Sequence, residues 1–193
     1  MFLVLTGLEI NLLKNKKYEL LGEWIKEYKP KNFWIKKKVK TYKNPWNNKD
    51  KLLKDYNYLE IVHKNLLNDL SSYLNKMNQV NHSKRYWQTL LDPWLLSYIA
   101  VLYDRWQTLD TVLKKNYKIL SPEKSFKHKR PKISDYALDK LFQEDEWNHN
   151  LFLEIINYKF NEKVSIIKDK RFKSKRQKIS NIKKRSSYIN ILK

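Results

Sequence analysis

A long amphipathic segment in the middle of the chain constrains the fold more than any other feature. Residues 50–79 carry apolar or aromatic side chains at two sets of positions, each repeating every seven residues and offset by four. The first set is Leu52, Leu59, Leu66 and Tyr73, and the second is Tyr56, His63, Leu70 and Met77. This spacing places all eight side chains on one stripe of a helix. The segment therefore predicts a long helix that packs along that stripe.

His63 lies on this stripe, and two interpretations are open. A histidine on an apolar helix face is most often packed in the core and hydrogen-bonded to a neighbour, which is the interpretation we favour. A ligand-binding or catalytic role is the alternative.

Further helices are expected towards the C-terminus. One begins near Ser83 and pauses at Asp92 and Pro93, which suit the N-cap and the first position of a new helix running to about Leu113. Residues 121–131 form a polar linker with two prolines. A shorter helix is expected from Ser134, and another over residues 147–160.

Strands are expected at the N-terminus. Residues 2–8 are a continuous apolar run, which predicts a buried strand, and residues 16–21 form a weaker second candidate. Residues 29–43 are rich in lysine and fit either a loop or an edge strand. The chain is therefore expected to adopt a helix-dominated α/β fold.

Composition excludes several classes of function. The 193 residues contain no Cys, so the chain has no disulfide framework, Cys-ligated zinc, iron–sulfur cluster or thiol nucleophile. Gly7 and Gly22 are its two glycines, too few for a GxGxxG loop or a Walker P-loop. The histidines show no HExxH or HxH spacing. No cofactor and no metal are expected.

The charge is strongly positive, at +21 from 41 Lys and Arg against 20 Asp and Glu. Residues 29–43 interleave lysines with aromatic side chains, as a single-stranded nucleic-acid site would. Only 6 of the 41 cations are Arg, the residue that specific phosphate and base recognition prefers. An excess of Lys beside abundant Asn, Ile and Tyr also fits an AT-rich genome. A nucleic-acid-binding protein and a helical interaction module without catalytic activity remain the alternatives.

The last segment differs from the rest. Residues 161–193 hold 12 Lys or Arg and 2 Asp or Glu, a net +10 (12 − 2), and their apolar residues are scattered. We expect a domain over residues 1–160 and a solvated, flexible basic tail over 161–193. No apolar stretch approaches the ~20 residues that span a bilayer, and no secretory signal is visible. A cytoplasmic location is expected, with peripheral contact at the inner membrane left open.

Several short motifs, taken in order, resemble one known family. They are residues 6–9 (TGLE), 21–24 (LGEW), 46–53 (WNNKDKLL), 55–59 (DYNYL), 80–87 (VNHSKRYW), 93–95 (PWL), 102–106 (LYDRW) and 146–149 (EWNH). The blocks around residues 81–87 and 103–105 are the most specific. Together they resemble the N-terminal part of a transferase family of bacterial surface-carbohydrate biosynthesis, first described in leptospires. The resemblance covers roughly residues 1–158, and the basic tail lies outside it.

The resemblance implies a fold and a function. The fold would be an incomplete Rossmann-like (GT-B-like) N-terminal domain, with a small parallel β-element and three to four long helices. The function would be that of a glycosyltransferase-like transferase of lipopolysaccharide or capsule assembly. Its partners would be a sugar- or phosphate-bearing acceptor and a nucleotide-sugar donor. Family members are longer, so the resemblance implies an N-terminal fragment or split part that transfers no sugar alone.

The candidate site residues lie in the motifs of the resemblance. His82 is expected to act as an acid/base or phosphate donor, and Asp104 to orient Arg105. An internal salt-bridge network is the alternative for Asp104 and Arg105, because charges inside an apolar helix need partners. The predicted site comprises catalytic His82 and Asp104, with substrate-binding Glu9 and Glu23 at strand ends and Arg85 and Arg105 for an anionic group.

Overall fold

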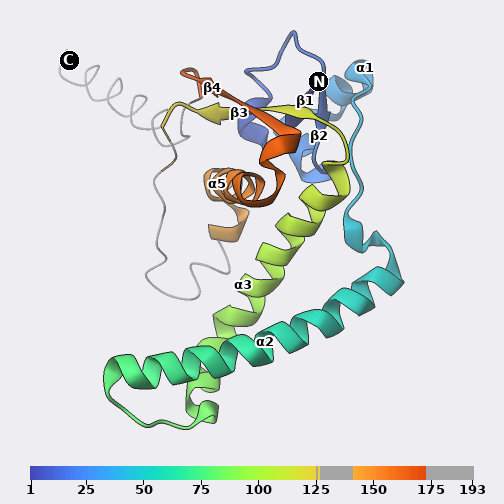
Figure 1. The fold of residues 1–193 in the computed structure, drawn as a ribbon. Coiled ribbons are helices and arrows are strands. Elements are labelled where there is room, and N and C mark those ends of the chain that lie inside the picture. Colours follow the sequence, from blue (N-terminus) through green and yellow to red (C-terminus); the bar gives the residue numbers. More distant parts are fainter. Residues whose placement is uncertain (125, 127–140, 173–193) are drawn as a thin grey trace, which may run out of the picture.

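The computed structural model, which describes residues 1–124, 126 and 141–172, combines a parallel sheet with a projecting helical hairpin (Figure 1). The strands are β1 (Phe2–Val4), β2 (Tyr18–Leu20), β3 (Tyr117–Pro122) and β4 (Val164–Asp169). The helices are α1 (Lys31–Lys37), α2 (Lys49–Asn78), α3 (Lys84–Val112) and α5 (Asp145–Ile155). The expected helix-dominated α/β fold with a small parallel sheet is confirmed.

The sheet has the strand order β2-β1-β3-β4, and every pairing is parallel. All four strands therefore end at the same edge of the sheet, which we call the carboxyl edge. β2 follows β1 in the sequence and lies on one side of it, whereas β3 lies on the other side of β1. This reversal of the strand order is the feature that defines the ligand-binding crevice of open α/β sheets, and it lies between β1 and β3.

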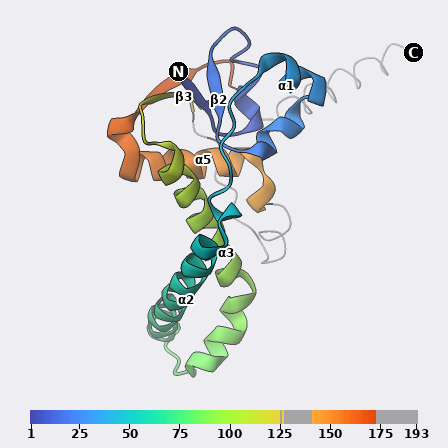
Figure 2. The same ribbon diagram turned by 90° about the vertical axis from the view of Figure 1, so that its right-hand side faces the viewer.

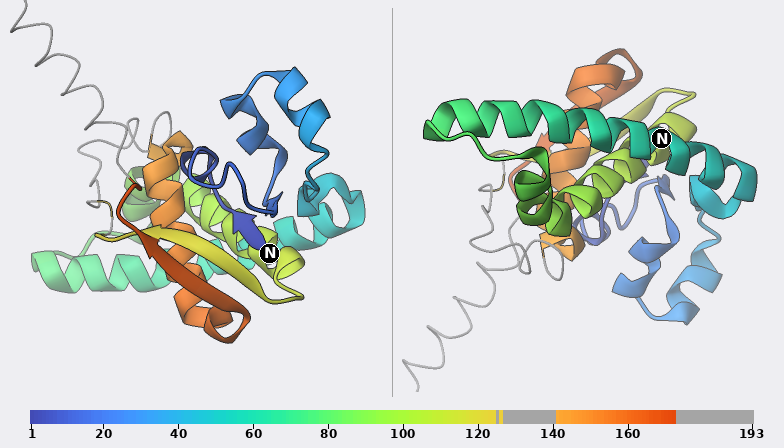
Figure 3. Two further views of the ribbon diagram at one scale, coloured as in Figure 1. Left: turned by 90° about the horizontal axis from the view of Figure 1, so that it is seen from above. Right: turned by 90° about the horizontal axis from the view of Figure 1, so that it is seen from below.

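The hydrophobic core lies between the sheet and the helices beneath it. Figure 3 shows, in the view from above, that α3 and α5 lie on the same side of the sheet. Leu3 and Ile119 from the strands, Leu109 from α3 and Phe152 from α5 are all part of this buried cluster. Neighbouring residues of a strand point to opposite faces, and both Leu3 and Val4 of β1 are buried, so this strand is covered on both faces. Such burial explains why β1 and β3 are rich in apolar residues instead of alternating apolar and polar ones.

The two expected N-terminal strands are confirmed, although both are shorter than predicted. The other two strands were not expected. Residues 121–122, assigned to a linker, complete β3, which pairs with β4 from Tyr117 opposite Val164 to Pro122 opposite Asp169.

β4 lies beyond the domain boundary that was predicted at residue 160. Val164, Ile166 and Ile167 have strand-forming side chains, but lysine-rich surroundings concealed the segment. Phe172, beyond the strand, is buried in the core. The fold thus continues through residue 172, and residues 173–193 of the expected tail lie outside the described part.

The predicted long helix is confirmed as α2, but the predicted packing stripe is wrong. Of its eight side chains only His63 is buried, and five are exposed, namely Leu52, Tyr56, Leu66, Tyr73 and Met77. Asn48 accepts a hydrogen bond from the backbone of Lys51 at its start, and Gln79 ends it in the left-handed conformation. His63 is buried, and its Nε2 lies 2.8 Å from Oδ1 of Asp92 on α3. The interpretation of His63 as a packed residue bonded to a neighbour is confirmed.

The expected helix break at Asp92 and Pro93 is wrong. α3 runs from Lys84 to Val112 with Pro93 inside it. Asp92 does not cap a new helix, because its carboxylate accepts hydrogen bonds from His63 and Gln88 instead. The pairing with α2 therefore keeps the two halves of α3 together despite the missing backbone donor of proline.

The remaining expectations differ in outcome. The lysine-rich segment contains α1, and Thr41 forms an isolated parallel bridge to Leu20 at the outer edge of β2. The helix expected over residues 147–160 is α5 followed by a π-helical turn, Ile156–Phe160. The helix expected from Ser134 falls largely outside the described residues. Within the described ranges, no helix has both the length and the apolar character needed to cross a bilayer.

Candidate functional site

The carboxyl edge gathers polar residues from segments far apart in the sequence. The turn after β1 contributes Thr6 and Glu9, β3 ends with Ser121 and Pro122, and β4 ends with Lys168 and Asp169. The start of α5 lies at the same edge, because its residues contact the turn after β1. This edge is where a ligand is expected in a parallel sheet of this order.

Glu9 is completely buried beneath this edge. Its Oε2 accepts hydrogen bonds from the backbone nitrogens of Leu5, at 2.6 Å, and Thr6, at 2.9 Å. Burial raises the pKa of Glu9 to about 8. The two backbone hydrogen bonds act in the opposite direction, and the negative charge of Asp145 raises the pKa further. Glu9 is therefore mostly protonated at neutral pH while it holds the turn after β1.

His149 on α5 faces Glu9. Its Nδ1 lies 3.9 Å from Oε2 of Glu9, and its side chain is also completely buried. Burial lowers the pKa of His149 to about 3, so the ring is neutral at pH 7. The rings of Phe126 and Phe172 lie 6.0 and 4.8 Å from it, between centroids. Among the described residues, Oε1 of Glu9 has no hydrogen-bond partner.

A pocket of about 390 Å³ opens beside this pair, between α5 and the ends of β3 and β4. Its polar lining consists of Ser121, Asn150, Glu154, Asn157 and Lys168. Asn150 is buried and donates a hydrogen bond to the backbone oxygen of Phe126. Lys168 is exposed and forms no ion pair with any described residue. The pocket thus offers a hydroxyl group, two amides, one carboxylate and one cation.

Gly7 belongs to the same turn after β1, and its lack of a side chain is needed here. A Cβ at this position would lie 2.1 Å from Cδ2 of Tyr28. The hydroxyl of Tyr28 donates a hydrogen bond to Asp145 on α5. Tyr28 therefore covers the turn and ties it to α5.

The structure separates the six predicted site residues. His82 and Arg85 are exposed at the turn between α2 and α3, at the opposite end of the molecule from the sheet (Figure 2). The ring of His82 stacks on Tyr86 with 4.0 Å between centroids. Asn75 holds this turn through hydrogen bonds with both backbone groups of His82, at 2.9 and 3.0 Å.

Asp104 and Arg105 lie in the middle of α3 and pair with each other. Nε of Arg105 also donates to Oδ1 of Asn148 at 2.8 Å, and Nη2 lies 3.4 Å from the backbone oxygen of Phe142. Both charged side chains are half-buried. The arrangement matches the alternative of an internal network, because Arg105 joins α3 to the start of α5.

Glu23 lies apart from all of these. Its side chain is 67% exposed and pairs with Lys26 at 2.8 Å. Of the six predicted residues, Asp104 and Arg105 are therefore brought together, and Glu9 is the one at the carboxyl edge. Sequence reasoning missed His149 as a site residue, although a histidine among the apolar residues of the last helix was a signal that it is buried. In the described ranges, no three acidic or histidine side chains are grouped as a metal site would require.

Comparison with known proteins assigns a family. A model of the LIC12162 family transferase matches residues 1–193. The match therefore includes the basic segment, which the motif resemblance had left outside. No curated protein and no solved structure matches the chain.

Proposed function

Because the chain belongs to the LIC12162 family of transferases, we propose that it is a glycosyltransferase-like transferase that binds a sugar- or phosphate-bearing ligand at the carboxyl edge. The observation that carries this proposal is the strand order, which places the reversal between β1 and β3 beside the pocket and the Glu9–His149 pair. Open parallel sheets bind their ligands at this position.

The chemistry of the pocket suits a sugar phosphate. Lys168 supplies a positive charge for a phosphate group, and the carboxylate of Glu154 in the same pocket can accept hydrogen bonds from sugar hydroxyls. Ser121 and Asn150 supply the hydroxyl and amide groups that sugar hydroxyls use as hydrogen-bond partners. The proposal therefore assigns ligand contact to this pocket rather than to His82 and Arg85.

Glu9 and His149 act in this proposal as positioning residues. Glu9 holds the turn after β1, and its neutral form avoids a buried negative charge below an anionic ligand. His149 contacts the aromatic rings of Phe126 and Phe172 and is the neighbour of Asn150, so it fixes the position of α5 against the edge. Neither side chain reaches the surface of the pocket.

The part of the proposal that concerns surface polysaccharides rests on the motif resemblance. The motifs at residues 81–87 and 103–105 resemble a family of surface-carbohydrate biosynthesis. A role in lipopolysaccharide or capsule assembly follows as a proposal. The proposal concerns ligand binding at the carboxyl edge, so binding is its direct readout.

The test is calorimetric titration of the chain with a panel of sugar 1-phosphates and nucleotide sugars. Lys168→Gln should weaken binding at least 10-fold, since it removes the cation of the pocket. Lys163→Gln is the matched control, because Lys163 precedes β4 and lies at the opposite edge of the sheet. No binding to any member of the panel, or equal losses in both variants, would contradict the proposal.

A further inference from the structure

A second pocket lies away from the sheet, between α2 and α3. It has a volume of about 610 Å³, within the range of small-molecule sites. Lys54, Tyr58 and Leu66 line it from α2, and Ile99, Tyr103 and Trp106 from α3. The family assignment gives this pocket no function.

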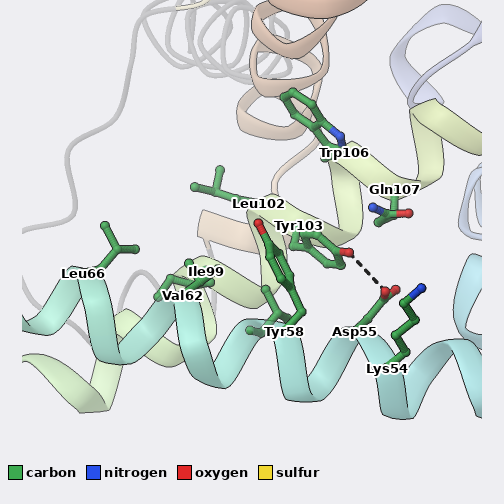
Figure 4. A pocket seen from close by; sticks show the side chains of 11 residues that line it. Lys54, Asp55, Tyr58, Val62, Leu66, Ile99, Leu102, Tyr103, Trp106 and Gln107 are labelled. Atoms are coloured by element: carbon green, nitrogen blue, oxygen red, sulfur yellow. Dashed lines mark hydrogen bonds between the residues drawn. The ribbon is translucent and has the colours of Figure 1, made fainter.

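The lining changes in character along the helices. Figure 4 shows Leu66, Val62 and Ile99 at one end and Lys54, Asp55 and Gln107 at the other, with aromatic side chains between them. From Lys54 to Leu66 the pocket follows α2 for about 18 Å at 1.5 Å per residue. One end therefore suits a hydrocarbon chain, and the other suits a polar group.

Asp55 is not available to a ligand at the polar end. It accepts hydrogen bonds from Nε1 of Trp46 at 2.9 Å, Nζ of Lys51 at 2.6 Å and the hydroxyl of Tyr103 at 3.1 Å. Burial alone would raise the pKa of Asp55, but these hydrogen bonds hold it below its ordinary value, so the group is an anion. Its charge is matched by Lys51, which also donates to Gln107 at 3.0 Å.

Lys54 remains as an uncompensated cation at this end of the pocket. Lys54 has no ion pair or hydrogen bond among the residues that the structure describes, and its side chain is exposed. Lys51, Lys54 and Asp55 together carry a net charge of +1. A negatively charged group is therefore favoured next to Lys54, and a positively charged one is disfavoured.

The middle and far end of the pocket are apolar. The rings of Tyr58 and Tyr103 lie 5.6 Å apart between centroids, and Trp46 stacks behind Tyr103 at 6.5 Å. Leu66 remains 38% exposed, although it lies on the apolar stripe of α2. A hydrocarbon chain along this wall would remove exposed apolar surface from water.

We propose that the pocket between α2 and α3 binds a single-chain amphiphile, with its hydrocarbon chain against Val62, Leu66 and Ile99 and its anionic head group at Lys54. The carboxyl edge is a separate location, so this proposal stands or falls independently of the proposed transferase site. The ligand of this proposal has one hydrocarbon chain and one anionic group, as in a lipid phosphate.

The experiment is calorimetric titration of the full chain with octyl, decyl and dodecyl phosphate below their micelle concentrations. The expected result is saturable binding to one site, up to ~4-fold tighter for each added methylene that is buried. Dodecyltrimethylammonium and inorganic phosphate should bind at least 10-fold more weakly than dodecyl phosphate. Failure of dodecyl phosphate to saturate one site, or equal binding of the cationic and anionic amphiphiles, would overturn the proposal.

Variants with matched controls locate the site. Leu66→Gln should weaken dodecyl phosphate binding at least 5-fold, whereas Leu96→Gln, at a 50% exposed position of α3 outside the pocket, should leave it within 2-fold. Lys54→Gln should weaken it similarly, and Lys64→Gln on the same helix should not. Circular dichroism confirms that each variant folds. Equal losses in a variant and its control would place the amphiphile elsewhere and overturn the assignment.

Discussion

Nδ1 of His149 lies 3.9 Å from Oε2 of Glu9, and both side chains are completely buried below the carboxyl edge. Two titratable groups that are 140 positions apart in the sequence thus share one buried site. Burial shifts the two pKa values in opposite directions, so both groups are uncharged at neutral pH. Because both groups are neutral in the fold, its stability is expected to depend on pH both above and below neutrality.

Stability should fall as the pH rises from 6.5 to 8. The pKa of Glu9 is about 8 in the fold against an ordinary 4.5, so over this range the folded state binds the proton that the unfolded state has lost. The free energy of unfolding should drop by about 2 kcal/mol through this group. Glu9→Gln should remove most of that drop in urea unfolding at pH 6.5 and 8. An unchanged drop in the variant would refute this origin.

Acid should destabilise the fold through His149. Its pKa is about 3 in the fold against an ordinary 6.5, so below pH 6.5 the unfolded state binds a proton that the folded state excludes. Between pH 6.5 and 4.5, acidification stabilises the fold through Glu9, and this gain offsets the destabilisation through His149. The net loss of stability should therefore appear below pH 4.5. His149→Gln should flatten the acid side of the profile relative to the wild type. A profile of the same shape in both proteins would show that other groups cause the loss.

Gly7→Ala should destabilise the fold because of Tyr28. The new methyl group would lie 2.1 Å from Cδ2 of the ring, which is far inside contact distance. Overpacking of this kind typically costs about 1–3 kcal/mol. The measurement is urea unfolding of Gly7→Ala alone and in the Tyr28→Ala background, where the cost should largely vanish. The same cost in both backgrounds would show that the backbone, not the ring, sets the requirement for glycine.

Arg105 should matter for stability rather than for ligand binding. Arg105→Ala leaves the carboxylate of Asp104 and the amide of Asn148 without this partner, and hydrogen bonds to charged groups contribute about 1.5–3 kcal/mol. Arg85→Ala is the control, because this exposed residue is expected to change stability by no more than ~0.5 kcal/mol. Equal stability of the two variants would contradict the role of Arg105 in joining α3 to α5.

β4 should be essential to the domain. A chain that ends at residue 160 lacks the strand that pairs with β3 over six residues, as well as Phe172 in the core. A chain that ends at residue 172 keeps both. Thermal unfolding followed by circular dichroism should show a cooperative transition for the longer chain and a weaker, broader one for the shorter. Identical transitions would support the domain boundary at residue 160 predicted from the sequence.

Periodicity and apolar runs sufficed for part of the fold. The seven-residue repeat predicted α2 within one residue at each end, and the apolar start predicted β1. β4 was missed because Lys163, Lys168 and Lys170 lie in or next to a short run of strand-forming residues. The high positive charge of the whole segment predicted a solvated tail, although the local pattern of Val164, Ile166 and Ile167 fits a strand. The break at Pro93 was predicted from local propensity, which the contact between Asp92 and His63 overrides.

The site was less predictable than the fold. Glu9 was identified from its place after the first strand, but its partner His149 is brought to it only by the tertiary arrangement of α5. Motif membership placed His82 and Arg85 together with Arg105, whereas the length of the hairpin moves the first two to the far end of the molecule (Figure 2). The motifs identified the segments, but the order of the strands determines which of these segments meet at the carboxyl edge.

The most direct test of the central claim is a map of backbone amide shifts in nuclear magnetic resonance spectra of the chain titrated with a sugar 1-phosphate. The largest shifts are expected around the pocket, at Ser121, at Lys168 and in α5 from Asn150 onward. The account also predicts unchanged signals at His82 and Arg85. Shifts concentrated at the turn between α2 and α3, with the carboxyl edge unaffected, would contradict the account.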